Sequence, residues 1–257
     1  MKTGIFLSYK GLGANLLHLS YCHEIAKKFG PIHLITLNPK LEKVLNYDHN
    51  IKKIIYLDKF HRKFTDILNL SKFLKDLNFK RIFIFYPSLR HVIASKFAGI
   101  NEVYHYPLFR KKNLHLVNAA KKFTEKSLKI KNCPTETKII FKKKILENKN
   151  IGQKKIILGI GSSGPTTRWG YYNFANLIKK LNKNQNYYFY LLCGPNENEG
   201  ANKIINIVGR ENCESLANRD IADIVDFIAS SEMYIGNDSY GHHIACQMNK
   251  KCHIILL

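Results

Sequence analysis

The sequence predicts an α/β protein with doubly wound parallel sheets. Short apolar runs alternate with longer amphipathic segments along all 257 residues, the pattern of strands that alternate with helices. The apolar runs are continuous, as in strands buried on both faces of a parallel sheet. A single stretch rich in lysine and asparagine, Phe141 to Lys155, interrupts the pattern. It predicts a linker between domains at residues 1–145 and 146–257.

The predicted strands are the apolar runs themselves. They are Gly4–Leu7, Ile32–Thr36, Ile54–Leu57, Arg81–Tyr86, Ile156–Ile160, Tyr187–Cys193, Met233–Ile235 and His253–Leu257. Between them, apolar residues that recur every three or four positions predict helices. The predicted helices are Asn15–Phe29, Phe64–Leu77, Leu114–Leu128, Tyr172–Leu181, Ile221–Ser230 and His242–Gln247.

The composition is that of a folded and strongly basic protein. Hydrophobic residues make up 45%, which excludes a disordered or collagen-like chain. Lysine and arginine number 41 against 19 aspartates and glutamates, a net charge of +22, which suits an anionic partner such as nucleic acid, acidic lipid or a phosphorylated substrate. The richness in Lys, Ile and Asn is also what an AT-rich genome produces without selection for binding. No nucleic-acid-binding motif accompanies the charge, so nucleic acid is not a favoured partner.

The cysteines and the N-terminus indicate the compartment. Without a CxxC pair the cysteines predict neither a zinc site nor a disulfide framework, and we expect them to be small core residues. They are Cys22, Cys133, Cys193, Cys213, Cys246 and Cys252. The first apolar run is too short for a signal peptide, and no window approaches the roughly 18 apolar residues of a spanning helix. The expected location is the cytoplasm.

Two glycine-containing loops follow predicted strands. In the first, Gly11 and Gly13 precede Asn15 and allow close approach of the backbone to a ligand; a merely structural turn is the alternative. Its spacing matches neither a dinucleotide fingerprint nor a P-loop. The second loop, Gly159–Gly170, combines hydroxyls with one guanidinium, and it predicts a phosphate cradle or, alternatively, a polar surface loop anchored by Trp169. Its cradle residues are Ser162, Ser163, Thr166, Thr167 and Arg168.

A third polar cluster, Gly236 to His243, also lies between a strand and a helix. All three loops are therefore expected at the carboxyl ends of strands, where open α/β sheets bind ligands. Asp238 and His243 are suited to binding hydroxyls or phosphate, while Ser239 is expected to cap the helix. The adjacent His242 and His243 should point about 100° apart on a helix, so no metal site is expected.

These motifs resemble glycosyltransferase family 9, the ADP-heptose:lipopolysaccharide heptosyltransferases and their relatives. The resemblance covers the first 30 residues loosely and Ile156 to Leu257 well. It rests on the Gly-Leu-Gly loop, Gly161–Trp169, the turn Cys193–Glu197, Gly236–Ser239 and His243–Ala245.

The resemblance implies a GT-B fold, in which two Rossmann-like domains face a cleft, and the second domain here would be incomplete because the chain stops at Leu257. Family members are inverting enzymes without an obligatory metal or cofactor, and the nucleotide-sugar donor is itself a substrate. The implied partners are an ADP-linked donor, a lipid-linked glycan acceptor and, through the basic charge, the anionic inner face of the plasma membrane.

The resemblance also implies roles for individual residues. The donor would contact Ser162, Ser163, Thr166, Thr167, Arg168, Glu197, Asp238, Ser239, Gly241 and His243, and the acceptor would contact Gly11, Gly13 and Asn15. In these assignments Thr166 to Arg168 bind the diphosphate, Glu197 approaches the nucleoside, and Asp238 is also catalytic.

Three positions depart from the family pattern. The aspartate that serves as the family's proposed general base is Ala14 here; His18 is the nearest titratable substitute, or else a residue of the helix surface. A lysine found in many members is replaced by Thr167, which leaves Arg168 as the phosphate cation. Tyr240 adds bulk to a turn that is tight in the family. The sequence thus predicts a heptosyltransferase-like enzyme or, alternatively, a catalytically weak or inactive nucleotide-sugar-binding paralogue.

Overall fold

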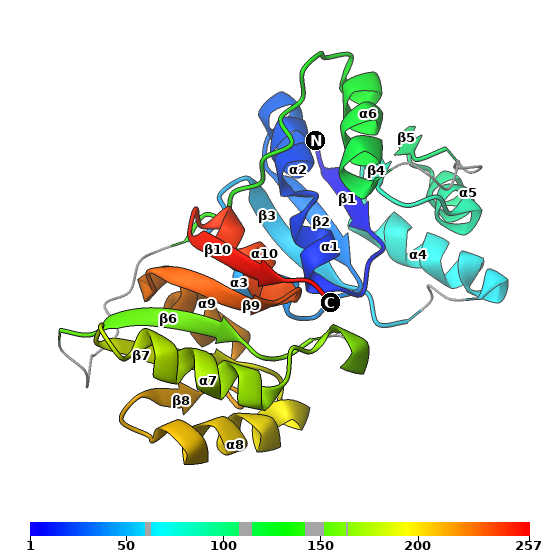
Figure 1. The fold of residues 1–257 in the computed structure, drawn as a ribbon. Coiled ribbons are helices and arrows are strands. Elements are labelled where there is room, and N and C mark those ends of the chain that lie inside the picture. Colours follow the sequence, from blue (N-terminus) through cyan, green and yellow to red (C-terminus); the bar gives the residue numbers. More distant parts are fainter. Residues whose placement is uncertain (60–62, 108–114, 142–151, 163) are drawn as a thin grey trace. The chain divides into compact units, whose positions relative to one another are not determined.

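The computed structural model describes residues 1–59, 63–107, 115–141, 152–162 and 164–257. The chain divides into two compact units, Met1–Lys138 and Ile139–Leu257, and each unit contains one five-stranded parallel sheet (Figure 1). The predicted α/β class with parallel sheets is confirmed. The predicted boundary after residue 145 falls within residues 142–151, outside the described residues. Lys155 does not belong to a linker, because it is already part of a strand.

The first unit has the strand order β3-β2-β1-β4-β5. Its strands are β1 (Thr3–Leu7), β2 (Ile32–Thr36), β3 (Ile51–Tyr56), β4 (Arg81–Ile84) and β5 (Glu102–His105). Its helices are α1 (Leu12–Leu16), α2 (Leu19–Phe29), α3 (Leu41–Val44), α4 (Ile67–Leu77), α5 (Leu89–Phe97) and α6 (Leu116–Leu128), with a 3-10 turn η1 (Phe64–Asp66). Leu70 and Leu74 of α4 pack with Phe6 and Ile84 in a buried core on one side of the sheet.

The second unit has the order β10-β9-β6-β7-β8. Its strands are β6 (Lys154–Gly159), β7 (Tyr187–Leu192), β8 (Cys213–Ser215), β9 (Met233–Asn237) and β10 (Lys251–Ile255). Its helices are α7 (Tyr171–Leu181), α8 (Asn198–Val208), α9 (Ile221–Ser230) and α10 (Tyr240–Gln247), with 3-10 turns η2 (Pro165–Thr167) and η3 (Pro195–Glu197). Phe174 and Ile178 of α7 pack with Leu158 and Phe189 of the sheet in the main core.

The two sheets share one topology. In each unit the first strand lies at the centre, the next two strands lie on one side of it, and the last two lie on the other. The strand order therefore reverses beside β1 in the first unit and beside β6 in the second. Such a switch point leaves a crevice at the carboxyl ends of the strands, where proteins with open α/β sheets bind their ligands.

Agreement between the predicted and the observed bounds varies from element to element. The predicted bounds of β2 and α9 are those observed, whereas the expected helix Asn15–Phe29 is interrupted and forms α1 and α2. The elements not predicted are α3, α5, α8, β5 and β8. The strands β5 and β8 have only four and three residues and contain a glutamate each, so they lack a continuous apolar run.

The cysteines follow the core expectation in part. Cys22, Cys133, Cys193 and Cys213 are buried, but Cys246 is exposed and therefore is not a core residue. No helix among the described residues is both long and apolar enough to cross a membrane.

A buried ion pair in the first unit gives a pH-dependent prediction. The Asp48 side chain is fully buried, and its Oδ2 lies 2.6 Å from His23 Nε2. Burial opposes ionisation of Asp48, but hydrogen bonds from His23 and Asn50 outweigh it, so the pKa of this carboxyl is lowered. A lowered folded-state pKa contributes stability above the unfolded pKa of about 3.9, and this contribution is lost as the pH falls through the folded pKa.

We expect Asp48→Asn to lower the free energy of unfolding by about 1–3 kcal/mol at pH 7, because it removes a charged acceptor from a buried hydrogen bond. Below about pH 4 the difference from the wild type should shrink, since the wild-type carboxyl is then increasingly protonated. Urea unfolding at pH 7 and pH 3 measures both values, with the exposed Asp58→Asn as control. A difference that stays constant with pH would contradict this account.

Candidate functional site

The switch point of the second unit brings two of the predicted loops together. β6 and β9 are neighbouring parallel strands, with Gly159 opposite Gly236 at their carboxyl ends. The second glycine-containing loop, which ends at Gly170, follows β6 directly, and Asp238 and Ser239 follow β9. The chain order of the strands thus places both polar loops side by side at one end of the sheet.

The glycines at the ends of these strands are required by close packing. A Cβ atom on Gly236 would overlap the backbone of Gly159, and one on Gly159 would overlap the hydroxyl of Tyr234. That hydroxyl is buried and donates to the carbonyl of Asn237 over 2.9 Å. The glycines therefore let β6 and β9 approach at the point where the site begins.

Asn237 joins the two loops. Its side chain is fully buried; Oδ1 accepts from the Trp169 backbone N–H (3.1 Å), and Nδ2 donates to the Ile160 carbonyl (2.9 Å). One side chain thus holds both ends of the loop after β6 against the end of β9. Asn237 was not among the predicted site residues; the signal in the sequence is an amide side chain directly at the end of a buried strand.

The loop after β6 uses its hydroxyls internally. Thr167 Oγ1 lies 2.8 Å from Ser162 Oγ, and the Ser162 hydroxyl donates to the Gly164 carbonyl over 2.6 Å. Thr166 is exposed, while Ser163 lies outside the described residues. The loop is therefore ordered by its own hydroxyls. Of its two threonines, Thr166 is the exposed one.

Glu197 binds this loop to the turn after β7. Its Oε1 accepts from the Ser162 N–H (3.1 Å) and pairs with Arg168 Nη2 (2.9 Å), while Oε2 accepts from the Gly194 N–H (2.9 Å). The guanidinium predicted to bind phosphate is thus held by a carboxylate at the rim of the site. Both oxygens of Glu197 have partners, so the structure gives this residue a role in joining the loops.

The start of α10 forms the third part of the site. Ser239 caps the helix as predicted, since its Oγ accepts from the Gly241 N–H over 3.3 Å. Burial raises the pKa of Tyr240 to about 12, and nearby Cys193 and Glu197 act in the same direction. The bulky Tyr240 of this turn therefore lies toward the end of β7 and its following turn.

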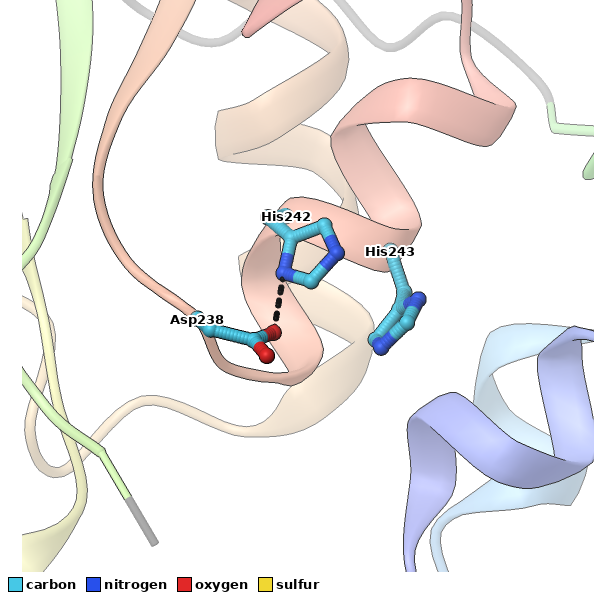
Figure 2. A group of neighbouring side chains, drawn as sticks. All are labelled: Asp238, His242 and His243. Carbon is cyan, nitrogen blue, oxygen red and sulfur yellow. Dashed lines mark ion pairs between the residues drawn. The ribbon is translucent and has the colours of Figure 1, made fainter. Parts of the chain in front are cut away.

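Asp238, His242 and His243 lie together at this helix start (Figure 2). Asp238 Oδ1 is 2.9 Å from His242 Nδ1, and the two imidazole centroids are 4.0 Å apart with an interplanar angle of 33°. The expectation that adjacent positions would hold these rings apart is wrong, because their side-chain torsions turn them toward each other. Burial lowers the pKa of His243 to about 4, with His242 adding to the effect; burial also lowers the pKa of His242, against the opposing charge of Asp238.

The predicted acceptor residues lie in the first unit, where Gly11 precedes α1 and Gly13 and Asn15 belong to it. Asn15 is fully buried, and its Nδ2 donates to the carbonyls of Tyr9 (3.0 Å) and Gly11 (2.7 Å). Its side chain therefore shapes the loop from inside. Gly11 is exposed with open space around its Cα, whereas Gly13 is buried in α1. Of the three, Gly11 is the residue whose surroundings leave room for a ligand.

A model of glycosyltransferase family 9 (heptosyltransferase) matches residues 86–253, well over half of the chain. The chain belongs to glycosyltransferase family 9. A comparison with curated proteins finds no match.

Solved structures of this family share the fold. E. coli ADP-heptose lps heptosyltransferase II is 17% identical with a TM-score of 0.78, and the match covers 100% of this chain and 85% of that one. The family 9 glycosyl transferase of Veillonella parvula is 16% identical with a TM-score of 0.77, covering 98% and 80%. E. coli heptosyltransferase WaaC with ADP-2-deoxy-2-fluoro heptose is 13% identical with a TM-score of 0.69, covering 99% and 88%. The predicted GT-B fold with two Rossmann-like sheets is confirmed.

His18 lies one turn after Ala14, the position of the family's proposed base. His18, the predicted substitute base, is fully buried; its Nδ1 lies 2.7 Å from the Ala14 carbonyl and its Nε2 3.3 Å from the Tyr106 hydroxyl. The ring also stacks on Tyr9 with centroids 5.0 Å apart. The alternative that His18 is a residue of the helix surface is therefore wrong. Its assignment as catalytic base is not supported either, because a base must reach the substrate proton within hydrogen-bond distance.

Proposed function

We propose that the chain transfers a sugar, with inversion, from an ADP-linked donor of the ADP-heptose type to a lipopolysaccharide or other cell-envelope glycan. Membership of family 9 supports the reaction class. Similar structures carry ADP and ADP-2-deoxy-2-fluoro heptose, which supports the donor class. The observation that carries the proposal is the pair of polar loops, tied by Asn237, at the switch point of the second unit.

The chemistry of the loops suits a leaving nucleoside diphosphate. In an inverting transfer the acceptor hydroxyl attacks the anomeric carbon, its proton passes to a base, and the C–O bond to the diphosphate breaks. The departing ADP gains negative charge, and we propose that Arg168, which pairs with Glu197 in the structure, and the N–H groups at the start of α10 stabilise this charge. We propose that Thr166, Asp238, Ser239 and His243 contact the donor, and that this step needs no obligatory metal or cofactor.

We further propose that the protein works in the cytoplasm, at the inner face of the plasma membrane. The support is the net charge of +22, which favours contact with anionic lipid and a phosphorylated acceptor. Lys10 and Lys122 of the first unit are exposed and available for it, whereas Lys27 pairs with Glu24 and Lys28 donates to the Leu128 carbonyl. The basic run Arg110 to Lys112 lies outside the described residues.

A second candidate function is nucleotide-sugar binding with little or no transfer. The observation that favours it is the lack of a carboxylate at Ala14 together with the buried position of His18. A methyl group accepts no proton, and general-base catalysis typically contributes about 10²- to 10⁴-fold to a rate.

Ala14→Asp tests whether the missing carboxylate limits transfer. We expect this variant to transfer heptose at least about 100-fold faster than the wild type, because it restores a base in α1, just after β1. The measurement is the release of ADP from ADP-heptose in the presence of heptose-deficient lipopolysaccharide, with the product verified by mass spectrometry.

Ala14→Asn is the matched control, since it has nearly the same size but accepts no proton at neutral pH. Equal rates for the aspartate and asparagine variants would show that no base is missing at this position. Absence of transfer in every variant, with ADP still bound, would favour the second candidate.

A further inference from the structure

The two histidines at the start of α10 can also act as metal ligands, a chemistry beyond the donor contact proposed for His243. His242 and His243 follow Asp238 by four and five positions, and all three side chains come from the first turn of the helix and the residue before its cap. Each offers one ligand atom, and these atoms lie within 4.8 Å of one another. Within the residues that the structure describes, no second trio of His, Cys, Asp or Glu converges in this way.

The spacing is close to that of an occupied site. Ligand atoms bound at about 2.0–2.2 Å from a common ion lie up to about 4 Å from each other. Closing the remaining gap needs a small movement, and the most exposed member supplies it: the Asp238 side chain is 56% exposed, against 15% for His242. The two ring centroids are already 4.0 Å apart, so the imidazoles need to rotate to aim their in-plane nitrogens at one ion rather than to move toward each other.

We infer that Asp238, His242 and His243 form a binding site for one first-row divalent transition-metal ion. Two imidazoles and one carboxylate select ions such as Zn²⁺, Co²⁺ or Fe²⁺, because Mg²⁺ and Ca²⁺ prefer oxygen ligands alone. Three protein ligands on one side of the ion leave further positions open to water or to an anion.

The ion would change the electrostatics of this helix start. Asp238 alone carries one negative charge beside the cap at Ser239, whereas the occupied trio carries a net charge of +1. This inference goes beyond the proposed transfer, which does not depend on the ion. Binding is therefore tested without nucleotide, and its outcome is separate from that of the proposed function.

Cobalt titration of the full chain tests the site. After removal of metals with a chelator that is then dialysed away, the protein is titrated with CoCl₂, and the visible d–d absorption is recorded. We expect saturation at one Co²⁺ per chain, with release of the ion by one equivalent of ZnCl₂. His242→Ala and His243→Ala should each weaken Co²⁺ binding by at least about tenfold.

Matched controls separate this trio from other ligands. His253→Ala removes an exposed histidine of the same unit, and Cys246→Ser with Cys252→Ser removes the two accessible thiols; both should bind Co²⁺ as the wild type does. Circular dichroism verifies that each variant is folded, and Asp238→Asn tests the carboxylate without the loss of a ring. Failure of the wild type to bind Co²⁺, or wild-type binding by folded His242→Ala and His243→Ala variants, would overturn the inference.

Discussion

Asn237→Ala is expected to lower the free energy of unfolding by about 2–4 kcal/mol and to abolish measurable ADP binding. The substitution removes the acceptor of the Trp169 N–H and the donor to the Ile160 carbonyl at a fully buried position. Each buried polar group left without a partner costs about 1–3 kcal/mol. The loop after β6 would also lose both of its ties to β9, so its ligand-facing groups would no longer be held in place.

Urea unfolding and calorimetric ADP titration measure the two effects. Asn173→Ala is the control: its Nδ2 donates to the carbonyl of the same Trp169 over 2.6 Å, but from an exposed position. We expect this control to unfold within about 1 kcal/mol of the wild type. Equal stability and equal ADP affinity of the two variants would show that Asn237 does not organise the site.

Arg168→Ala is expected to weaken ADP binding by about 10- to 100-fold. A hydrogen bond to a charged group contributes about 1.5–3 kcal/mol, and 1.4 kcal/mol corresponds to a factor of ten. Arg168 is the guanidinium at the rim of the loop, where Glu197 orients it over 2.9 Å. The side chain is 36% exposed, so it can turn from Glu197 toward a diphosphate without unfolding the loop.

Two further variants isolate the charge from the general effect of removing an arginine. Arg168→Lys keeps the cation but not the planar fork, so its affinity should lie between those of the wild type and Arg168→Ala. Arg210→Ala removes an exposed arginine elsewhere in the same unit and should leave the affinity unchanged. An unchanged affinity in Arg168→Ala would remove this residue from the donor site.

The placement of the loops could be predicted from sequence because it follows from chain order. Each polar cluster comes directly after a buried apolar run, and the carboxyl ends of parallel strands share one edge of the sheet. The helix cap at Ser239 could be predicted for a similar reason, since a cap depends on neighbouring residues alone. The donor class that we propose comes from the family motifs, because these local features do not indicate it.

Contacts made across the fold could not be predicted in this way. The burial of His18 depends on Tyr106, which lies 88 positions away, and the bridge of Asn237 to Ile160 spans 77 positions. The convergence of His242 and His243 depends on side-chain torsions, which an average helix geometry leaves open.

Helix α8 was not predicted because Gly200 interrupts the apolar pattern near its start. This glycine lies under the ring of Tyr171, where a Cβ atom has no room.

The central claim is that the switch point of the second unit binds a nucleoside diphosphate. Calorimetric titration of the wild-type chain with ADP, in parallel with UDP, GDP and CDP, tests it most directly. We predict one site per chain with micromolar affinity for ADP and weaker binding of the other three. No binding of any of these nucleotides by the folded protein would contradict the claim, and the family fold would then carry a different function in this chain.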